Sequence, residues 1–291
     1  MKAEHSYRNY PNTSKLASDI EKLLARKREV SGSHCNNLSY GLSRIDRFIS
    51  GTEFDCEVLT KQAVEAFVTE IKSRKLKPAS LENFLTPLRH LALYQRELGK
   101  DAFLCMESVP NAADQYRRPY IPSDEEFKAL CAYLNSYLVT VPLDKRHFDL
   151  CCSVMVRLYV LCGLRNSEAT DLLREEVRFS DNTLYIRHSK GDKDRIVPVS
   201  DEVAALLKRC DEFLEQRFPD RKYFFVNTRG ERIINCNVDR WFRCHWQQCF
   251  NDKPKDQRPT VQDLRHTFVV RCIDSWGGEA GTDFGVKFPL L

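Results

Sequence analysis

The apolar positions in the first hundred residues recur at the spacing of amphipathic helices. Leu16 and Ile20, for example, lie one helical turn apart within Ser14–Glu29, so they share one face of a helix. Three further stretches show the same period and are joined by short connections. Four such helices predict a compact helical bundle. The three further stretches are Cys35–Ile49, Thr60–Ser73 and Pro78–Leu98.

The helical pattern breaks at Pro110–Pro122. This stretch has no helical period, and it holds three prolines and the adjacent pair Arg117 and Arg118. Such a composition is typical of a linker between domains. The pattern therefore predicts a first domain at 1–109, a linker at 110–122 and a second domain at 123–291.

The second half combines helices with a few short β-rich runs. Ser123 and Glu126 have the spacing of a capping box. Phe148–Cys162 is mostly apolar, which predicts a helix buried on most sides, and Thr183–Val199 reads as a β-hairpin. We therefore predict a mainly α protein with a small β-sheet, an α+β fold. The other predicted elements are a helix from Ser123 to Leu138, a helix at Asp201–Phe218, a strand at Tyr223–Val226, and helices near Asn237–Phe250 and from Thr260.

Composition narrows the class of protein. The 291 residues are 42% hydrophobic and 30% charged, which is typical of a folded protein large enough for two domains. No apolar run is long enough for a bilayer, and the N-terminus has no apolar signal region, so we expect a cytoplasmic protein with no membrane partner. A net charge of +4 neither requires nor excludes nucleic acid.

The twelve cysteines are scattered and form no Cys-x-x-Cys pair. This distribution predicts reduced thiols rather than a disulfide framework or a zinc site. Cys236, Cys244, His245 and Cys249 come nearest to a metal cluster, but their spacing matches no common site. We therefore expect no metal and no cofactor.

One arginine stands where the apolar helix breaks off. Gly163 is a natural helix stop, and Asn166 or Ser167 is expected to cap a new helix with Glu168 in its first turn. Arg165 would then lie on a rigid corner beside a helix N-terminus, where a phosphate can be held. The alternative is an arginine that only pairs with a carboxylate at a helix end.

Two later stretches carry further cations in comparable settings. Lys190 lies near the tip of the predicted hairpin, and Arg265 lies on the helical stretch that begins at Thr260. The motifs around these residues are Gly-Leu-Arg-x-Ser-Glu, Lys-Gly-x-Lys-x-Arg and Gln-x-Leu-Arg-His-Thr-Phe. Together and in this order they resemble the boxes of the tyrosine recombinase (phage integrase) family. The motifs span Gly163–Glu168, Lys190–Arg195 and Gln262–Phe268.

The resemblance implies a helical core-binding (SAM-like) domain at the N-terminus, which clamps double-stranded DNA, and a recombinase catalytic domain after the linker. It implies that Arg165 and Arg265 clamp the scissile phosphate and that Lys190 is the general acid, with Lys193 as the rival for that role. It further implies a nucleoid-associated protein that assembles as a homo-tetramer on DNA and needs no cofactor. Basic residues of the first domain would contact phosphates, although a solvated helix end explains them equally well; these are Lys72, Arg74, Lys75 and Lys77.

The sequence departs from the family pattern at two points. Gln262 stands where the family has histidine, and glutamine donates a hydrogen bond but exchanges no proton near neutral pH. His266 is expected to pack beneath the arginine instead. No tyrosine follows Arg265, and the last one is Tyr223.

These departures predict a C-terminally truncated recombinase without its own nucleophile. The tyrosine could then come from another subunit, such as an intact recombinase. Two alternatives stay open: a non-catalytic DNA-binding or regulatory remnant that competes for recombination sites, and a helical protein-interaction module.

Overall fold

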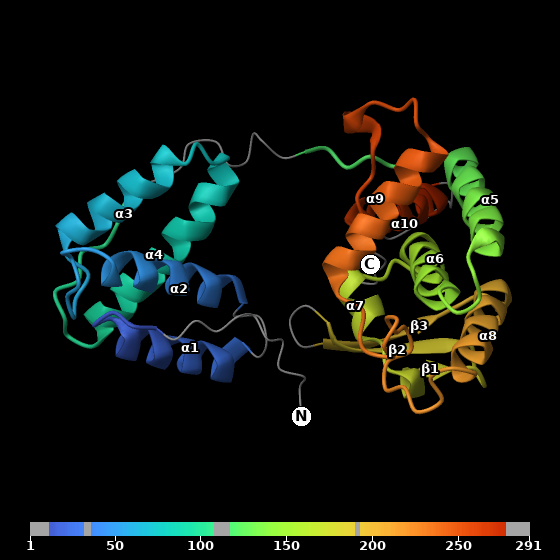
Figure 1. Cartoon of the computed structure of the whole chain (residues 1–291), viewed down its shortest axis with the longest axis horizontal. Coiled ribbons are helices and arrows are strands. Elements are labelled where there is room, and N and C mark those ends of the chain that lie inside the picture. The colour runs from blue at the N-terminus through green and yellow to red at the C-terminus, as the bar shows by residue number, and fades with distance from the viewer. Residues whose placement is uncertain (1–11, 32–35, 108–116, 190–192, 278–291) are drawn as a thin grey trace. The chain divides into compact units, whose positions relative to one another are not determined.

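The computed structural model describes residues 12–31, 36–107, 117–189 and 193–277. The chain forms two compact units, Met1–Arg117 and Arg118–Leu291, and each has a hydrophobic core of its own (Figure 1). Among the helices within these ranges, none has the length and apolar character needed to cross a lipid bilayer.

The first unit contains the predicted bundle: α1 (Ala17–Ser31), α2 (Asn36–Ser50), α3 (Lys61–Ser73) and α4 (Pro78–Glu97). Helix α4 carries Pro87 in its interior, and Gly41 of α2 lies against the proline ring. A Cβ atom at Gly41 would lie 2.3 Å from Pro87 Cγ. The missing side chain therefore makes room for the ring, and this lets α2 and α4 pack closely.

The second unit contains α5 (Asp124–Thr140), α6 (Arg146–Leu161), α7 (Asn166–Asp171), α8 (Asp201–Glu215), α9 (Asn235–Cys249) and α10 (Val261–Gly277). Two short 3-10 helices accompany them, η1 (Arg174–Glu176) and η2 (Lys255–Gln257). The predicted capping box is confirmed, because the Ser123 hydroxyl accepts from the Glu126 backbone and the Glu126 carboxylate accepts from the Ser123 backbone.

Helix α6 is the centre of the second unit. Most of its residues are buried, and it packs against α5, α8, α9 and α10 (Figure 1). Even its polar residue Arg157 is 9% exposed. The guanidinium donates to the carbonyls of Ser153 and Cys131, at 2.8 and 3.2 Å, and to Asn135 Oδ1 at 2.8 Å. The apolar run thus forms the buried helix that its composition predicted.

The sheet has three antiparallel strands in the order β1 (Val177–Arg178), β2 (Thr183–Ser189) and β3 (Lys193–Pro198). The β2–β3 pair is the predicted hairpin, while the two-residue strand β1 was too short to predict. Side chains alternate between the faces, so Leu184 and Ile186 are buried. The segment 190–192, which includes Lys190, lies outside the described residues.

The predicted strand at Tyr223–Val226 is wrong. The segment makes only isolated bridges, from Tyr223 to Leu173 and from Val226 to Arg232. Phe224, Phe225 and Val226 are fully buried, so their β-forming side chains serve the core instead of a ladder. Helix α8 also ends at Glu215, three residues before the predicted end.

Gly163 should be the least replaceable residue of the corner between α6 and α7. Its φ is +63°, and an added Cβ would lie 2.3 Å from Phe268 Cδ1. We expect Gly163→Ala to lower the free energy of unfolding by about 3 kcal/mol, from backbone strain plus overpacking. Denaturant titration of the intact chain measures this.

Gly99→Ala is the matched control for that substitution. Gly99 also has a positive φ of +77°, but nothing lies within 4 Å of its added Cβ. We expect Gly99→Ala to lower the free energy of unfolding of the first unit by about 1 kcal/mol, from the backbone conformation alone. Equal costs at the two positions would mean that the contact with Phe268 is not tight.

Candidate phosphate-binding site

Arg165 lies at the corner between α6 and α7. It is the N-cap residue of α7, with an extended backbone of φ −75° and ψ 153°. The expected cap at Asn166 or Ser167 is wrong, because Glu168 supplies the cap by accepting the Arg165 backbone N–H at 2.8 Å. Asn166 instead accepts the Tyr159 hydroxyl at 2.9 Å. The corner is thus fixed by contacts on both sides of Arg165.

The carboxylate of Glu168 is the centre of the site. Its side chain is 4% exposed. Oε1 accepts from Arg165 Nη1 at 2.7 Å and from Arg195 Nη1 at 2.8 Å. Oε2 accepts from the Arg165 backbone and, at 2.7 Å, from Arg195 Nη2. Burial raises the pKa of Glu168, but the hydrogen bonds from Arg195 and Arg165 outweigh it and lower the pKa to about 2.

Strand β3 brings Arg195 to this carboxylate. Arg195 is paired with Ile186 of β2, and Ile186 faces the core. The neighbouring Tyr185 points the other way, where its hydroxyl donates to Asp194 Oδ2 at 2.8 Å. The pleat therefore directs Arg195 inward, toward α7. Its two terminal nitrogens hold the two oxygens of Glu168 in a bidentate pair.

Helix α10 contributes Arg265 from a firmly capped first turn. Asp263 Oδ2 accepts the Thr260 backbone N–H at 2.8 Å, and Thr260 Oγ1 accepts the Asp263 N–H at 3.2 Å. Arg265 is 9% exposed and donates to the backbone carbonyl of Gly163. Burial lowers the pKa of Arg265, and the charge of Arg165 lowers it further. The two arginine motifs therefore meet at one corner of the second unit.

The remaining predicted site residues are either at least partly exposed or outside the described residues. Gln262 lies in the first turn of α10 with an exposed side chain, and His266 is half-buried. Lys190 falls outside the described residues, and so does the side chain of Lys193. The structure thus brings together the two predicted arginines, and it adds Arg195 as a third, which sequence reasoning treated only as part of a motif.

The charges at the corner favour an anion. Three guanidinium groups and one carboxylate give +3 − 1 = +2, and the carboxylate is already shared between two of the arginines. Arg165 and Arg195 are about one-third exposed, so solvent and ligands reach them. Planar forks of this kind suit phosphate oxygens.

The residues that come nearest to a metal cluster in the sequence lie on or beside α9, around His245. The His245 ring lies between aromatic rings, 4.4 Å from Tyr137 and 4.2 Å from Trp241 between centroids. Cys236 and Cys244 are exposed on α9. In the ranges that the structure covers, no three His, Cys, Asp or Glu residues are grouped to hold a metal ion.

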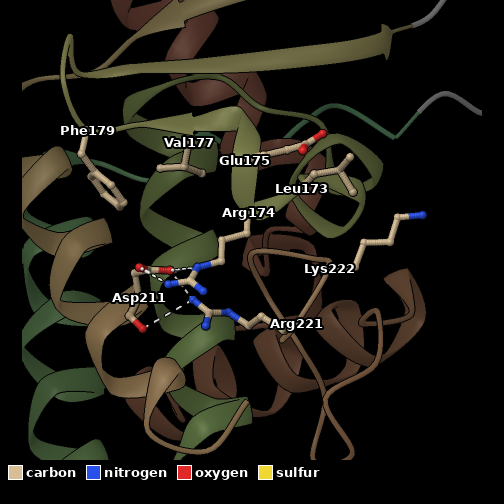
Figure 2. Close-up of a pocket in the computed structure, with 8 residues that line it drawn as sticks. All are labelled: Leu173, Arg174, Glu175, Val177, Phe179, Asp211, Arg221 and Lys222. Atoms are coloured by element: carbon tan, nitrogen blue, oxygen red, sulfur yellow. Dashed lines mark hydrogen bonds and ion pairs between the residues drawn. The ribbon is translucent and has the colours of Figure 1, made fainter. Parts of the chain in front are cut away.

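A hollow of about 590 Å³ lies elsewhere on the second unit (Figure 2). Figure 2 shows Arg174 and Arg221 both pointing toward Asp211, and Arg174 Nε lies 3.0 Å from Asp211 Oδ1. None of the three corner arginines lines this hollow. Its own arginines are held by carboxylates, so it is a packing feature between η1 and α8 rather than part of the corner.

Comparison with known proteins identifies the second unit. Residues 124–275, just over half of the chain, match the phage integrase family. The integrase/recombinase y4rE of Sinorhizobium fredii is 26% identical over 79% of this chain and 72% of its own. Tyrosine recombinase XerA of Thermococcus onnurineus is 29% identical over 69% of this chain and 70% of its own.

Solved structures share the fold. The XerH recombinase bound to palindromic difH substrate has a TM-score of 0.62 at 16% identity, and it covers 89% of this chain and 74% of its own. A lambda integrase dimer bound to a COC′ core site has a TM-score of 0.57 at 14% identity over 88% of each chain. The predicted mainly α fold with a small sheet is thereby confirmed.

Glu168 should make stability depend on acid pH. Its pKa is about 2 in the folded chain, below the ordinary 4.5, so its contribution is complete above pH 4.5 and is lost as the pH falls toward 2. The shift corresponds to about 3 kcal/mol. We expect the stability difference between the wild type and Glu168→Gln to shrink by about this amount between pH 6 and pH 2, as measured by urea titration.

The matched control is Glu212→Gln, at an exposed carboxylate of α8. Its stability difference from the wild type should stay nearly constant over the same pH range. A Glu168 difference that is independent of pH would contradict the shared ion pair.

Proposed function

The chain belongs to the phage integrase family of tyrosine recombinases, and we propose that it binds double-stranded DNA as a site-specific recombinase. In this proposal the corner of the second unit holds one backbone phosphate at the site of strand cleavage and rejoining. The observation that carries it is the meeting of both arginine motifs, since Arg265 donates to the carbonyl of Gly163, two residues before Arg165. Two similar solved structures are the Tn1549 transposon integrase in complex with transposon right end DNA and the lambda integrase bound to DNA, and they support a DNA partner.

The chemistry follows from the charges. Arg165 and Arg265 hold the non-bridging oxygens of the phosphate and stabilise the negative charge that grows as the phosphorus is attacked. Lys190 donates a proton to the sugar oxygen that leaves, and Gln262 donates a hydrogen bond where the family has histidine. A tyrosine attacks the phosphorus to form a 3′-phosphotyrosyl bond, which conserves the energy needed for rejoining.

The attacking tyrosine comes, in this proposal, from outside the 291 residues. The last tyrosine of the sequence is Tyr223. Tyr159 is the tyrosine nearest to Arg165 in the described sequence, but it is fully buried and its hydroxyl donates to Asn166. Burial also raises the pKa of Tyr159, which makes its oxygen a poor nucleophile. An intact, tyrosine-bearing recombinase subunit would supply the group.

The first unit acts in this proposal as the core-binding domain. Its basic run is only partly available for phosphates, because Lys72 pairs with Glu107 and Arg74 pairs with Glu70. Lys75 and Lys77 are exposed in the turn between α3 and α4, and they remain candidates for phosphate contact.

A second candidate function is a DNA-binding regulator that occupies recombination sites without cutting. Gln262 favours it, because glutamine exchanges no proton near neutral pH at the position where the family has histidine. The two functions differ in whether any strand transfer depends on Arg165.

DNA binding by the 291-residue chain is the first test. We expect affinity for a mixed-sequence duplex that falls steeply with salt, because phosphate contacts release counterions. Arg165→Ala should weaken it about tenfold, whereas Arg209→Ala, at an exposed arginine of α8, should change it less than about threefold. Fluorescence anisotropy over a salt series measures both, and no binding even at low salt would overturn the proposal.

Covalent capture is the second test. The chain alone should form no protein–DNA adduct that survives denaturing electrophoresis. When it is mixed with a tyrosine-bearing relative on that relative's site, an adduct that requires Arg165 of this chain supports catalysis in trans. Unchanged adduct formation with Arg165→Ala supports the regulator, and an adduct formed by the chain alone contradicts an external nucleophile.

A further inference from the structure

We propose that Arg195 is a positioning residue, which neutralises Glu168 so that Arg165 stays available to the DNA phosphate and which fixes the β2–β3 hairpin to the same corner. The inference rests on the proposed function, since it describes how the same phosphate site is set. Arg195 acts here through Glu168 and not through the substrate.

The contacts show that Glu168 has a stronger partner than Arg165. Arg195 binds the carboxylate with both terminal nitrogens, at 2.8 and 2.7 Å, one on each oxygen. Arg165 reaches it with Nη1 at 2.7 Å. The bidentate pair is the geometrically more specific of the two. Arg195 is therefore the principal counter-ion of this carboxylate.

Because Glu168 is buried, it needs a counter-ion in addition to Arg165. The Glu168 side chain is 4% exposed, so its charge requires a cation close by. Without Arg195, the carboxylate would depend more strongly on Arg165, in competition with a phosphate for the same guanidinium. With Arg195 present, that competition is reduced. Glu168 can thus stabilise the structure of the site, and the site keeps its affinity for an anion.

The position of Arg195 in the hairpin gives it a second role. Ile186 and Arg195 form a regular cross-strand pair, but the register shifts between Ile186 and Ser189, so that Ser189 pairs with Lys193. An irregularity of this kind disrupts the ladder of hydrogen bonds locally. Arg195 stands at the last regular pair before it, and there its side chain is tied to α7. The hairpin is therefore anchored to the Arg165 corner where its own ladder becomes irregular.

Double-mutant cycles with DNA test the first role. We expect Arg195→Gln to weaken binding of a mixed-sequence duplex about tenfold, but by less than about twofold in an Arg165→Ala background. Adding Glu168→Gln to Arg195→Gln should restore affinity to within about threefold of the wild type, because a neutral amide no longer competes for Arg165. Arg209→Gln on α8 controls for the loss of one positive charge.

Arg195→Lys serves as a second variant in case Arg195→Gln does not fold. Lysine keeps a cation beside the buried carboxylate but cannot form the bidentate pair. Its affinity should lie between those of the wild type and Arg195→Gln. An Arg195→Gln effect that persists in full in the Arg165→Ala background would show that Arg195 contacts DNA itself, and this would overturn the proposal. Additive losses in the Glu168→Gln double variant would overturn it as well.

A measurement without DNA separates this inference from the proposed function. Proton exchange at the Arg165 side chain, followed by nitrogen-15 NMR and assigned with Arg165→Ala, should slow in Arg195→Lys and Arg195→Gln as Glu168 holds Arg165 more tightly. Unchanged exchange would overturn the positioning role even if DNA binds. Slower exchange in a chain that binds no DNA would leave the role of Arg195 standing and would refute only the proposed function.

Discussion

The sharing of one buried carboxylate among arginines is the interaction on which the rest of the site depends. Glu168 caps α7 through the Arg165 backbone, pairs with the Arg165 side chain, and holds Arg195 of β3. The start of α7, strand β3 and the Arg165 side chain are therefore held by the two oxygen atoms of one carboxylate. Because N–H donors of Arg165 and Arg195 reach both oxygens, burial of the charge is compensated.

The other half of the site depends on the backbone of Gly163. A left-handed residue is needed to turn the chain from α6 into α7, and Phe268 of α10 occupies the space that a side chain would fill. The carbonyl of the same residue accepts from Arg265. One glycine therefore joins the two arginine motifs, which lie about a hundred residues apart in sequence. Helix α6 brings this corner to the centre of the unit, where α10 can pack against it.

Much of this could be predicted from the sequence, because the signals are local. Helical periods located the bundle, Ser123 and Glu126 located a helix start, and Gly163 located the end of α6. The motifs pointed to Arg165 and Arg265.

The contacts that complete the site are not local, and the sequence did not reveal them. Arg195 meets Glu168 only because the hairpin folds back on α7, although the alternation of Ile186 and Tyr185 could have indicated the inward face. The strand predicted at Tyr223–Val226 was wrong because residue types that favour strands also favour the core, and the local pattern does not distinguish the two. The exposed Gln262 shows that motif position alone does not define a side chain's surroundings.

The charge state of the corner has a consequence for enzymology. Glu168 has a pKa of about 2 in the folded chain, so its carboxylate stays ionised throughout the physiological pH range. Gln262 carries no group that titrates in this range. The charge of Glu168 therefore stays constant over this range. In the function proposed above, a pH profile of strand transfer would therefore report on the attacking oxygen and on the acid at the leaving oxygen, and not on Glu168 or Gln262.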